Sequence, residues 1–225
     1  MLKGLKRLLL AAGAVGVASV GGYLYAATWH PAADAYPVQG VDVSAQTGAI
    51  DWNMARARGV DFGYAVATRG DRLRDPAFVG HWRDLRAAGV RRGALHVYSL
   101  CADATDQADH FNATVPRIGD ALPAAVALDF APDCHARPGR AAFLSDFRAF
   151  LSRVERHTGQ PMLVRPSAAF EDEYGVSAAL ARTFWGTRSF LEPDYLAPGW
   201  RMWQASTIRR VEGFERPVNW NVVAS

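Results

Sequence analysis

Short apolar runs recur along most of the chain and alternate with longer amphipathic stretches. The runs have the length and the branched or aromatic residues of buried strands. Eight runs fit this description: Val38–Val43, Phe62–Thr68, Gly93–Tyr98, Ala124–Phe130, Pro161–Val164, Thr183–Thr187, Arg201–Ala205 and Val218–Val222.

Helical patterns fill several of the intervals between these runs. Pro76–Ala88 is the clearest short helix, because it has Pro in its first turn and Gly89 just after its end. Arg140–His157 carries an apolar stripe at helical spacing, made of Phe143, Phe147, Phe150, Leu151 and Val154. Asp51–Arg58 and Asp106–Val115 are the other two predicted helices.

Strands that alternate with helices predict an α/β fold with a closed, mostly parallel sheet. The chain has 225 residues, of which 50% are hydrophobic, and seven are Trp. This is enough for one well-buried domain and too short for two. A full (β/α)8 barrel usually needs about 250 residues, so we expect some helices to be short or missing.

The N-terminus has the pattern of a targeting or anchoring segment. Lys3, Lys6 and Arg7 precede an uncharged run from Leu8 to Thr28, which is 21 residues long. That length suffices for a membrane-spanning helix, whereas a signal peptide usually has a shorter apolar core. Ala33-Asp34-Ala35 still offers a small-x-small cleavage site, so both interpretations stay open.

These features predict three segments. Residues 1–29 form an N-terminal apolar helix that is a membrane anchor or signal segment, residues 30–37 a linker, and residues 38–225 the folded domain. The flanking positive charges favour a cytoplasmic N-terminus. We therefore expect an inner-membrane anchor through residues 8–28 with a periplasmic or extracytoplasmic domain, or a secreted domain if the segment is cleaved.

Charge argues against nucleic-acid binding. The net charge is +3, and the three basic residues before Leu8 account for all of it, since the first acid is Asp34. The remaining chain is neutral and shows no basic stripe with interleaved aromatic residues.

Cys101 and Cys134 are the only cysteines. They could pair in an oxidising compartment, or remain two small buried residues. A disulfide would close a loop of 32 residues, worth about 3–4 kcal/mol by loop entropy. Two cysteines with no nearby His pair do not predict a metal site.

Two carboxylates stand at predicted strand ends, where barrel enzymes keep their reactive groups. Asp42 ends the first strand, and Asp129 lies inside the apolar run Ala125–Phe130. A buried Asp129 would suit a general acid, although a structural Asp that caps the following turn fits as well. Asp42 could serve the chemistry or only bond backbone amides.

Other polar and aromatic residues end the remaining strands. His96, Tyr98, Trp185 and Trp203 could line a sugar-binding cleft or belong to the core. Gln204 and Asn219 are further candidates for that cleft.

Several motifs, in this order, resemble the glycoside hydrolase family 25 lysozymes. They are Gly40-Val41-Asp42-Val43-Ser44 with Ile50-Asp51-Trp52, Ala67-Thr68-x-Gly70, Ala87-Ala88-Gly89-x-x-x-Gly93-x-x-His96-x-Tyr98, Gln107-Ala108-x-x-Phe111, Leu122-Pro123, Trp203-Gln204 and Val218-x-x-Asn221. The resemblance spans about residues 38–223.

The resemblance implies an irregular, flattened (β/α)8-type barrel. It also implies hydrolysis, without metal or other cofactor, of the β-1,4 bond between N-acetylmuramic acid and N-acetylglucosamine. That family carries an Asp on its first strand, an Asp-x-Glu pair after its fourth and an Asp on its last. By position, Asp42 matches the first acid, Ala127 and Asp129 replace the pair, and Asn219 replaces the last Asp.

From these residues we predict an exported lysozyme-type hydrolase (a muramidase) that acts on peptidoglycan glycan strands as a monomer. Asp129 would be its acid and Asp42 its base or stabiliser, while His96, Tyr98, Trp203, Gln204 and Asn219 would bind the sugar. The alternative is a catalytically impaired peptidoglycan-binding module on the same fold.

Overall fold

A closed sheet forms the centre of the protein in the computed structural model, which describes residues 2–197 and 199–224, with the backbone alone for residues 2–11 and 14. The strands are β1 (Val38–Val43), β2 (Phe62–Arg69), β3 (Leu73–Arg74), β4 (Arg91–Val97), β5 (Ala125–Leu128), β6 (Leu163–Pro166), β7 (Thr183–Thr187), β8 (Trp200–Arg209) and β9 (Val218–Val223).

The strands close into a barrel because β1 pairs with both ends of the sheet. The order is β1-β9-β8-β7-β6-β5-β4-β2, and β1 also pairs with β2. Neighbouring strands are parallel except at β9, which runs antiparallel to β1 and β8. The two-residue β3 forms a hairpin with β2 outside the barrel. The predicted α/β fold with a closed (β/α)8-type sheet is thus confirmed.

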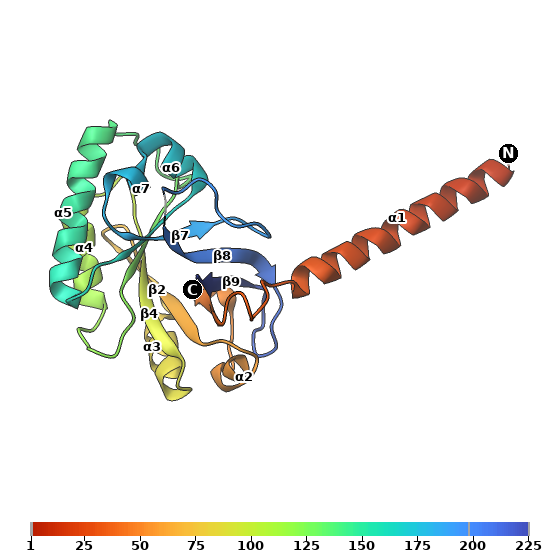
Figure 1. The fold of residues 1–225 in the computed structure, drawn as a ribbon, viewed down its shortest axis with the longest axis horizontal. Coiled ribbons are helices and arrows are strands. Elements are labelled where there is room, and N and C mark those ends of the chain that lie inside the picture. The colour runs from red at the N-terminus through yellow and green to blue at the C-terminus, as the bar shows by residue number, and fades with distance from the viewer. Residues whose placement is uncertain (1, 198, 225) are drawn as a thin grey trace.

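Helices surround the barrel unevenly (Figure 1). They are α1 (Leu2–Thr28), the short 3-10 helix η1 (Ala45–Thr47), α2 (Trp52–Ala57), α3 (Phe78–Ala87), α4 (Ala104–Thr114), α5 (Arg140–Thr158), α6 (Ala168–Tyr174) and α7 (Val176–Ala179). The β7–β8 connection, in its described residues 188–197 and 199, contains no helix. Because the helices are short and one connection lacks a helix, the barrel fits into a chain of 225 residues.

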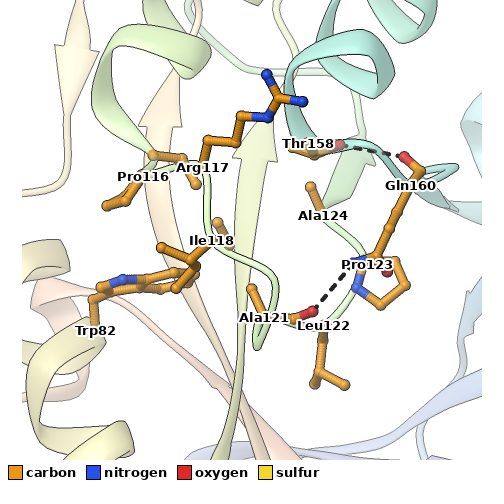
Figure 2. Close-up of a pocket in the computed structure, with 12 residues that line it drawn as sticks. Trp82, Pro116, Arg117, Ile118, Ala121, Leu122, Pro123, Ala124, Thr158 and Gln160 are labelled. Atoms are coloured by element: carbon orange, nitrogen blue, oxygen red, sulfur yellow. Dashed lines mark hydrogen bonds between the residues drawn. The ribbon is translucent and has the colours of Figure 1, made fainter.

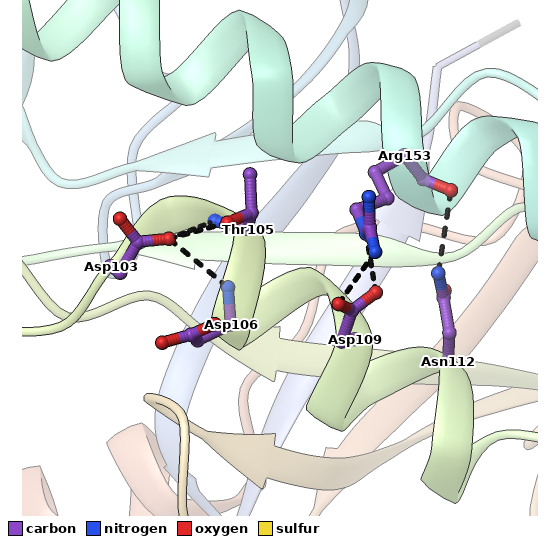
Figure 3. A network of polar contacts seen from close by, with 6 residues as sticks. All are labelled: Asp103, Thr105, Asp106, Asp109, Asn112 and Arg153. Atoms are coloured by element: carbon purple, nitrogen blue, oxygen red, sulfur yellow. Dashed lines mark hydrogen bonds and ion pairs between the residues drawn. The ribbon is translucent and has the colours of Figure 1, made fainter.

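The long helices α4 and α5 pack side by side on one wall of the barrel (Figure 1). Figure 3 shows how α4 is fixed. The Asp103 carboxylate caps it by accepting the backbone N–H of Thr105 at 2.7 Å and of Asp106 at 3.2 Å. Arg153 of α5 then pairs with Asp109 of α4. Capping and pairing hold the helix pair against the sheet.

Two apolar cores lie on the two faces of the sheet. The larger core fills the space between sheet and helices and contains the predicted stripe of α5, including Phe147 and Phe150. The smaller core lies inside the barrel and contains Tyr64, Ala127 and Trp185. Alternate residues of a strand face opposite sides, so this division tells which side chains can reach the barrel interior.

The segment between α1 and β1 packs on the barrel. Trp29 and Tyr36 both lie edge-on to Trp203 of β8, with ring centroids 6.3 and 5.8 Å away. The Gln39 side chain donates to the backbone oxygens of Pro31 and Tyr36. The predicted linker at residues 30–37 is therefore held against the domain.

Helix α1 extends away from the barrel (Figure 1). Within the described part of the chain, no helix combines the length and the apolar character that crossing a membrane requires. The side chains of Lys3, Lys6 and Arg7 lie outside the described residues. The membrane anchor stays a prediction.

The structure joins Cys101 to Cys134 in a disulfide with a Cα–Cα distance of 5.8 Å. Cys101 follows β4 and Cys134 follows β5. The bridge therefore ties together two loops at the carboxyl ends of neighbouring strands.

Candidate active site

The Asp42 carboxylate is a buried polar group at the carboxyl end of the barrel with several polar contacts. Asp42 is only 6% exposed. It accepts hydrogen bonds from the side-chain amides of Asn219 and Asn221, each at 2.8 Å. Both donors come from β9, where Asn219 is the register partner of Asp42. Two amide donors on one carboxylate fix its position and orientation.

Arg165 of β6 reaches the same carboxylate from across the barrel. Its Nη1 lies 3.1 Å from Oδ2 of Asp42; the Asp42 side chain is buried, at 5% exposure, and that of Arg165 is partly buried, at 13%. The guanidinium also stacks on Trp185, 4.5 Å from the ring centroid. The Trp185 indole N–H in turn donates to Oδ1 of Asn221 at 3.1 Å. A closed network from four strands thus surrounds Asp42.

Sequence reasoning missed Arg165 and gave Asn221 no role. The predicted fifth strand, Pro161–Val164, ends two residues before the observed strand β6 does. Because Leu163 packs against the interior core, alternation points Arg165 to the same side. The signal was available as a basic residue at a strand's carboxyl end.

Asp129 lies at the rim of the barrel. Strand β5 ends at Leu128, and Asp129 is exposed, so the expected burial of this side chain was wrong. The physical reason is that the strand ends at Leu128, so Asp129 already belongs to the loop that follows. Its Oδ1 accepts the backbone N–H of Phe130 at 2.8 Å. Asp42 and Asp129 are thus both at the carboxyl end of the barrel, but they share no bonding partner within the described residues.

Ala127 occupies the interior face of β5, beside Arg165. The two residues are register partners on adjacent parallel strands. The position that would hold an acid by resemblance is therefore apolar, and a cation lies next to it.

His96 and Tyr98 lie on the helix side of the sheet, so the prediction that they line a cleft is corrected. His96 is fully buried and stacks on Phe150 at 5.0 Å. Tyr98 packs edge-on to Phe147 and Phe150. Burial lowers the pKa of His96 to about 3 and raises that of Tyr98. Both belong to the larger core.

Trp203 and Gln204 lie on opposite faces of β8. Trp203 is buried under Trp29, and its indole N–H donates to the Arg188 backbone oxygen at 2.7 Å, so its predicted place in the cleft is also corrected. Gln204 is the register partner of Asn221 and of Thr187. Alternation places Gln204 and Asn219 on the interior side, where they can contribute to the mouth.

A groove of about 340 Å³ opens at the carboxyl ends of β1, β2 and β4, and neither Asp42 nor Asp129 lines it. Residues that line it include Ser44, Val66, Arg69, Arg74 and Val97. Its size lies in the range of ligand sites, and its lining mixes apolar and polar groups as a sugar site does. This groove is the candidate place for a saccharide.

The described residues contain no group of three or more His, Cys, Asp or Glu side chains placed to hold a metal ion.

Comparison with known proteins assigns the chain and its fold to a family. The family description "Glycosyl hydrolases family 25" matches residues 41–214. The chain belongs to glycosyl hydrolases family 25. This match contains Asp42, Ala127, Asp129 and Arg165, whereas Asn219 and Asn221 follow it.

Individual relatives agree with this family. The uncharacterized protein YegX of Escherichia coli K12 is 30% identical over 193 residues, covering 83% of this chain and 70% of its own. Lysozyme M1 of Streptomyces globisporus is 28% identical over 205 residues, covering 84% and 68%. A family 25 glycosyl hydrolase from Bacillus anthracis superposes with a TM-score of 0.78 at 25% identity, covering 86% of this chain and 92% of that one.

Proposed function

We propose that this protein is an exported lysozyme-type glycoside hydrolase that cleaves β-1,4 glycosidic bonds of peptidoglycan. The observation that carries the proposal is a family 25 barrel with Asp42 fixed at the end of its first strand. The resemblance to Lysozyme M1 supports a cell-wall glycan as substrate. The basic residues before the apolar N-terminal run support export and anchoring.

Asp129 is the candidate general acid in this proposal. Its exposed carboxyl stands at the rim, where the oxygen of a bound glycosidic bond can approach it. Proton donation to that oxygen lets the leaving sugar depart as an alcohol.

Asp42 fits the role of a fixed anion better than that of a base. A base must accept a proton, but both Asp42 oxygens already accept amide hydrogen bonds and one also faces Arg165. Its negative charge instead stabilises the positive charge that develops on the sugar ring in the transition state.

Because the barrel mouth contains Arg165 and Ala127, we expect hydrolysis to be slow. Arg165 offsets the charge of Asp42, and Ala127 supplies no charge of its own. Loss of one electrostatic partner typically costs about a hundred- to a thousandfold in rate.

The second candidate is a peptidoglycan-binding module without hydrolysis. The Asp42–Arg165 pair favours this candidate. Of the four family positions, only 42 and 129 hold acids here, and Asp42 is paired with Arg165. Asp129 is then the one of these acids that has no ion pair among the described residues. The groove at the carboxyl ends of β1, β2 and β4 would then hold a glycan strand without cutting it.

Muropeptide release from purified peptidoglycan by the full-length protein separates the two candidates. Asp129→Asn keeps the hydrogen-bond acceptor for Phe130, removes the acid and should lower release at least about a hundredfold. Asp133→Asn is the matched control, since Asp133 is exposed in the same loop. It should leave release unchanged.

Sedimentation with intact peptidoglycan gives the other readout. Binding without release, equal in wild type and Asp129→Asn, would support the binding module and overturn the hydrolase. Neither binding nor release would overturn both candidates.

A further inference from the structure

An apolar pocket lies at the opposite end of the barrel from the candidate active site. Its volume is about 380 Å³, within the range of small-molecule sites. Its lining comes mostly from the amino-terminal ends of the parallel strands and from the end of β9: Val38, Phe62, Tyr64, Arg91, Leu122, Pro123, Leu163, Thr183, Arg201, Met202 and Val223.

Two glycines explain why this end of the barrel is not filled. A Cβ on Gly93 would lie 2.3 Å from the Tyr64 ring, and one on Gly40 would lie 2.6 Å from the Phe62 ring. The two aromatic rings therefore lie close against the backbone of neighbouring strands, where any side chain would displace them. The space inside the barrel end stays open and aromatic-lined.

The pocket wall offers little hydrogen bonding from within. The Tyr64 hydroxyl is already used, because it donates to the Pro123 backbone oxygen at 2.9 Å. The interior lining is otherwise mostly apolar, with Leu163 and Met202 on the far wall. Such a wall favours a hydrocarbon or aromatic body over a sugar.

Positive charge is concentrated at the rim. Arg91 begins β4, and Arg201 is the second residue of β8, so they approach the pocket from different sides of the barrel. Both are exposed, and within residues 2–197 and 199–224 neither guanidinium lies within ion-pair distance of a carboxylate. An anion at the entrance would find two guanidinium groups that have no carboxylate partner among the described residues.

We propose that this pocket binds a small amphiphilic carboxylate, with its apolar body among Phe62, Tyr64 and Leu163 and its carboxylate at Arg91 and Arg201. The site lies at the other end of the strands from Asp42 and is independent of the proposed hydrolysis. It also differs from the hollow in Figure 2, which has a volume of about 20 Å³, room for about one water. In that view Leu122, which lines both spaces, points away from Thr158.

Calorimetric titration of the full-length protein in detergent-free buffer tests this site, with decanoate as the probe below its micelle concentration. Decanol and acetate are the controls, because each keeps one half of the ligand. Decanoate should bind with one site per chain, decanol about tenfold more weakly and acetate not measurably.

Substitutions separate pocket from surface. Thr183→Trp places an indole at the exposed rim and should abolish decanoate binding, while Thr207→Trp, at an exposed position of β8 outside the lining, should not. Arg91→Gln and Arg201→Gln should each weaken decanoate about threefold and together about tenfold, without changing decanol binding.

Decanoate binding that survives Thr183→Trp, as binding along α1 would, overturns the pocket assignment. Equal affinity for decanol and decanoate overturns the role of the two arginines, and no binding at all overturns the whole proposal.

Discussion

The Arg165 guanidinium lies 3.1 Å from the Asp42 carboxylate, inside the mouth of a family 25 barrel. The pair joins β6 to β1, which are not neighbours in the sheet. Asp42 is thus held by a cation on one side and by the amides of Asn219 and Asn221 on the other. This arrangement makes Asp42 a fixed charge. The structure of the barrel mouth depends on Arg165, because its guanidinium is the cation next to that charge.

Arg165→Met should lower the free energy of unfolding by about 3 kcal/mol. Methionine keeps much of the length and apolar surface but leaves the buried Asp42 carboxylate without its cation. Urea unfolding at pH 7 measures the loss. Arg72→Met is the matched control, because the Arg72 side chain is 86% exposed, and its effect should stay within about 0.5 kcal/mol. Equal losses in the two variants would show that the pair does not stabilise the fold.

Ala127→Asp should raise hydrolysis at least about tenfold over wild type. Ala127 is the register partner of Arg165, so a carboxylate there competes for the guanidinium and releases the charge of Asp42. It also restores an acid where the family resemblance places one. Muropeptide release per folded molecule is the measurement.

Ala127→Asn is the control for that gain. It has almost the same shape but no charge, so it should leave release at the wild-type rate. A gain shared by Asn and Asp would mean that polarity or shape, and not charge, limits the reaction.

The barrel could be predicted from the sequence because its strands are buried on both faces and read as apolar runs. The same property hid which residues point inward, since a strand that is apolar on both faces carries no period-two signal. The pattern therefore does not distinguish His96 and Tyr98, which face the helices, from Leu95, which faces the barrel interior. Trp203 likewise belongs to the larger core, whereas alternation with Met202 places Gln204 on the interior face, and its role in sugar binding stays a prediction.

The missing site residues have a different cause. Arg165 precedes Pro166, and an Arg-Pro pair indicates the end of a strand, yet β6 continues through both residues. Contacts between distant strands, such as Arg165 with Asp42, depend on barrel closure and on side-chain reach. A single sequence contains neither.

Reduction of the Cys101–Cys134 disulfide should lower the free energy of unfolding by about 3–4 kcal/mol, because the bond closes a loop with a sequence separation of 33. Urea unfolding with and without dithiothreitol measures the difference. The double variant Cys101→Ala, Cys134→Ala should show a similar loss and no response to the reductant. A response of the double variant would trace the effect to something other than this bond.

His96 should make the protein less stable as the pH falls below about 6.5. Burial lowers the pKa of the folded-state imidazole to about 3, so between these two values the unfolded chain binds a proton that the folded chain does not. Stability is therefore full above pH 6.5 and falls on acidification, with a slope approaching about 1.4 kcal/mol per pH unit from this group. Buried His81, whose pKa is also lowered, adds to the slope in the same direction.

The hydrogen bonds of His96 fix the form that resists protonation. The Gln107 amide donates to the backbone oxygens of Ser99 and Ala102, which leaves its oxygen to accept Nε2–H of His96 at 3.3 Å. Nδ1 then accepts a hydrogen bond from the Thr68 hydroxyl at 2.7 Å. A second proton on the ring would have to bind at Nδ1 and would break this hydrogen bond. Urea unfolding between pH 7 and 4.5 tests this, with His96→Gln expected to flatten the slope whatever its own stability. A variant slope as steep as that of wild type would mean that other groups account for the acid sensitivity.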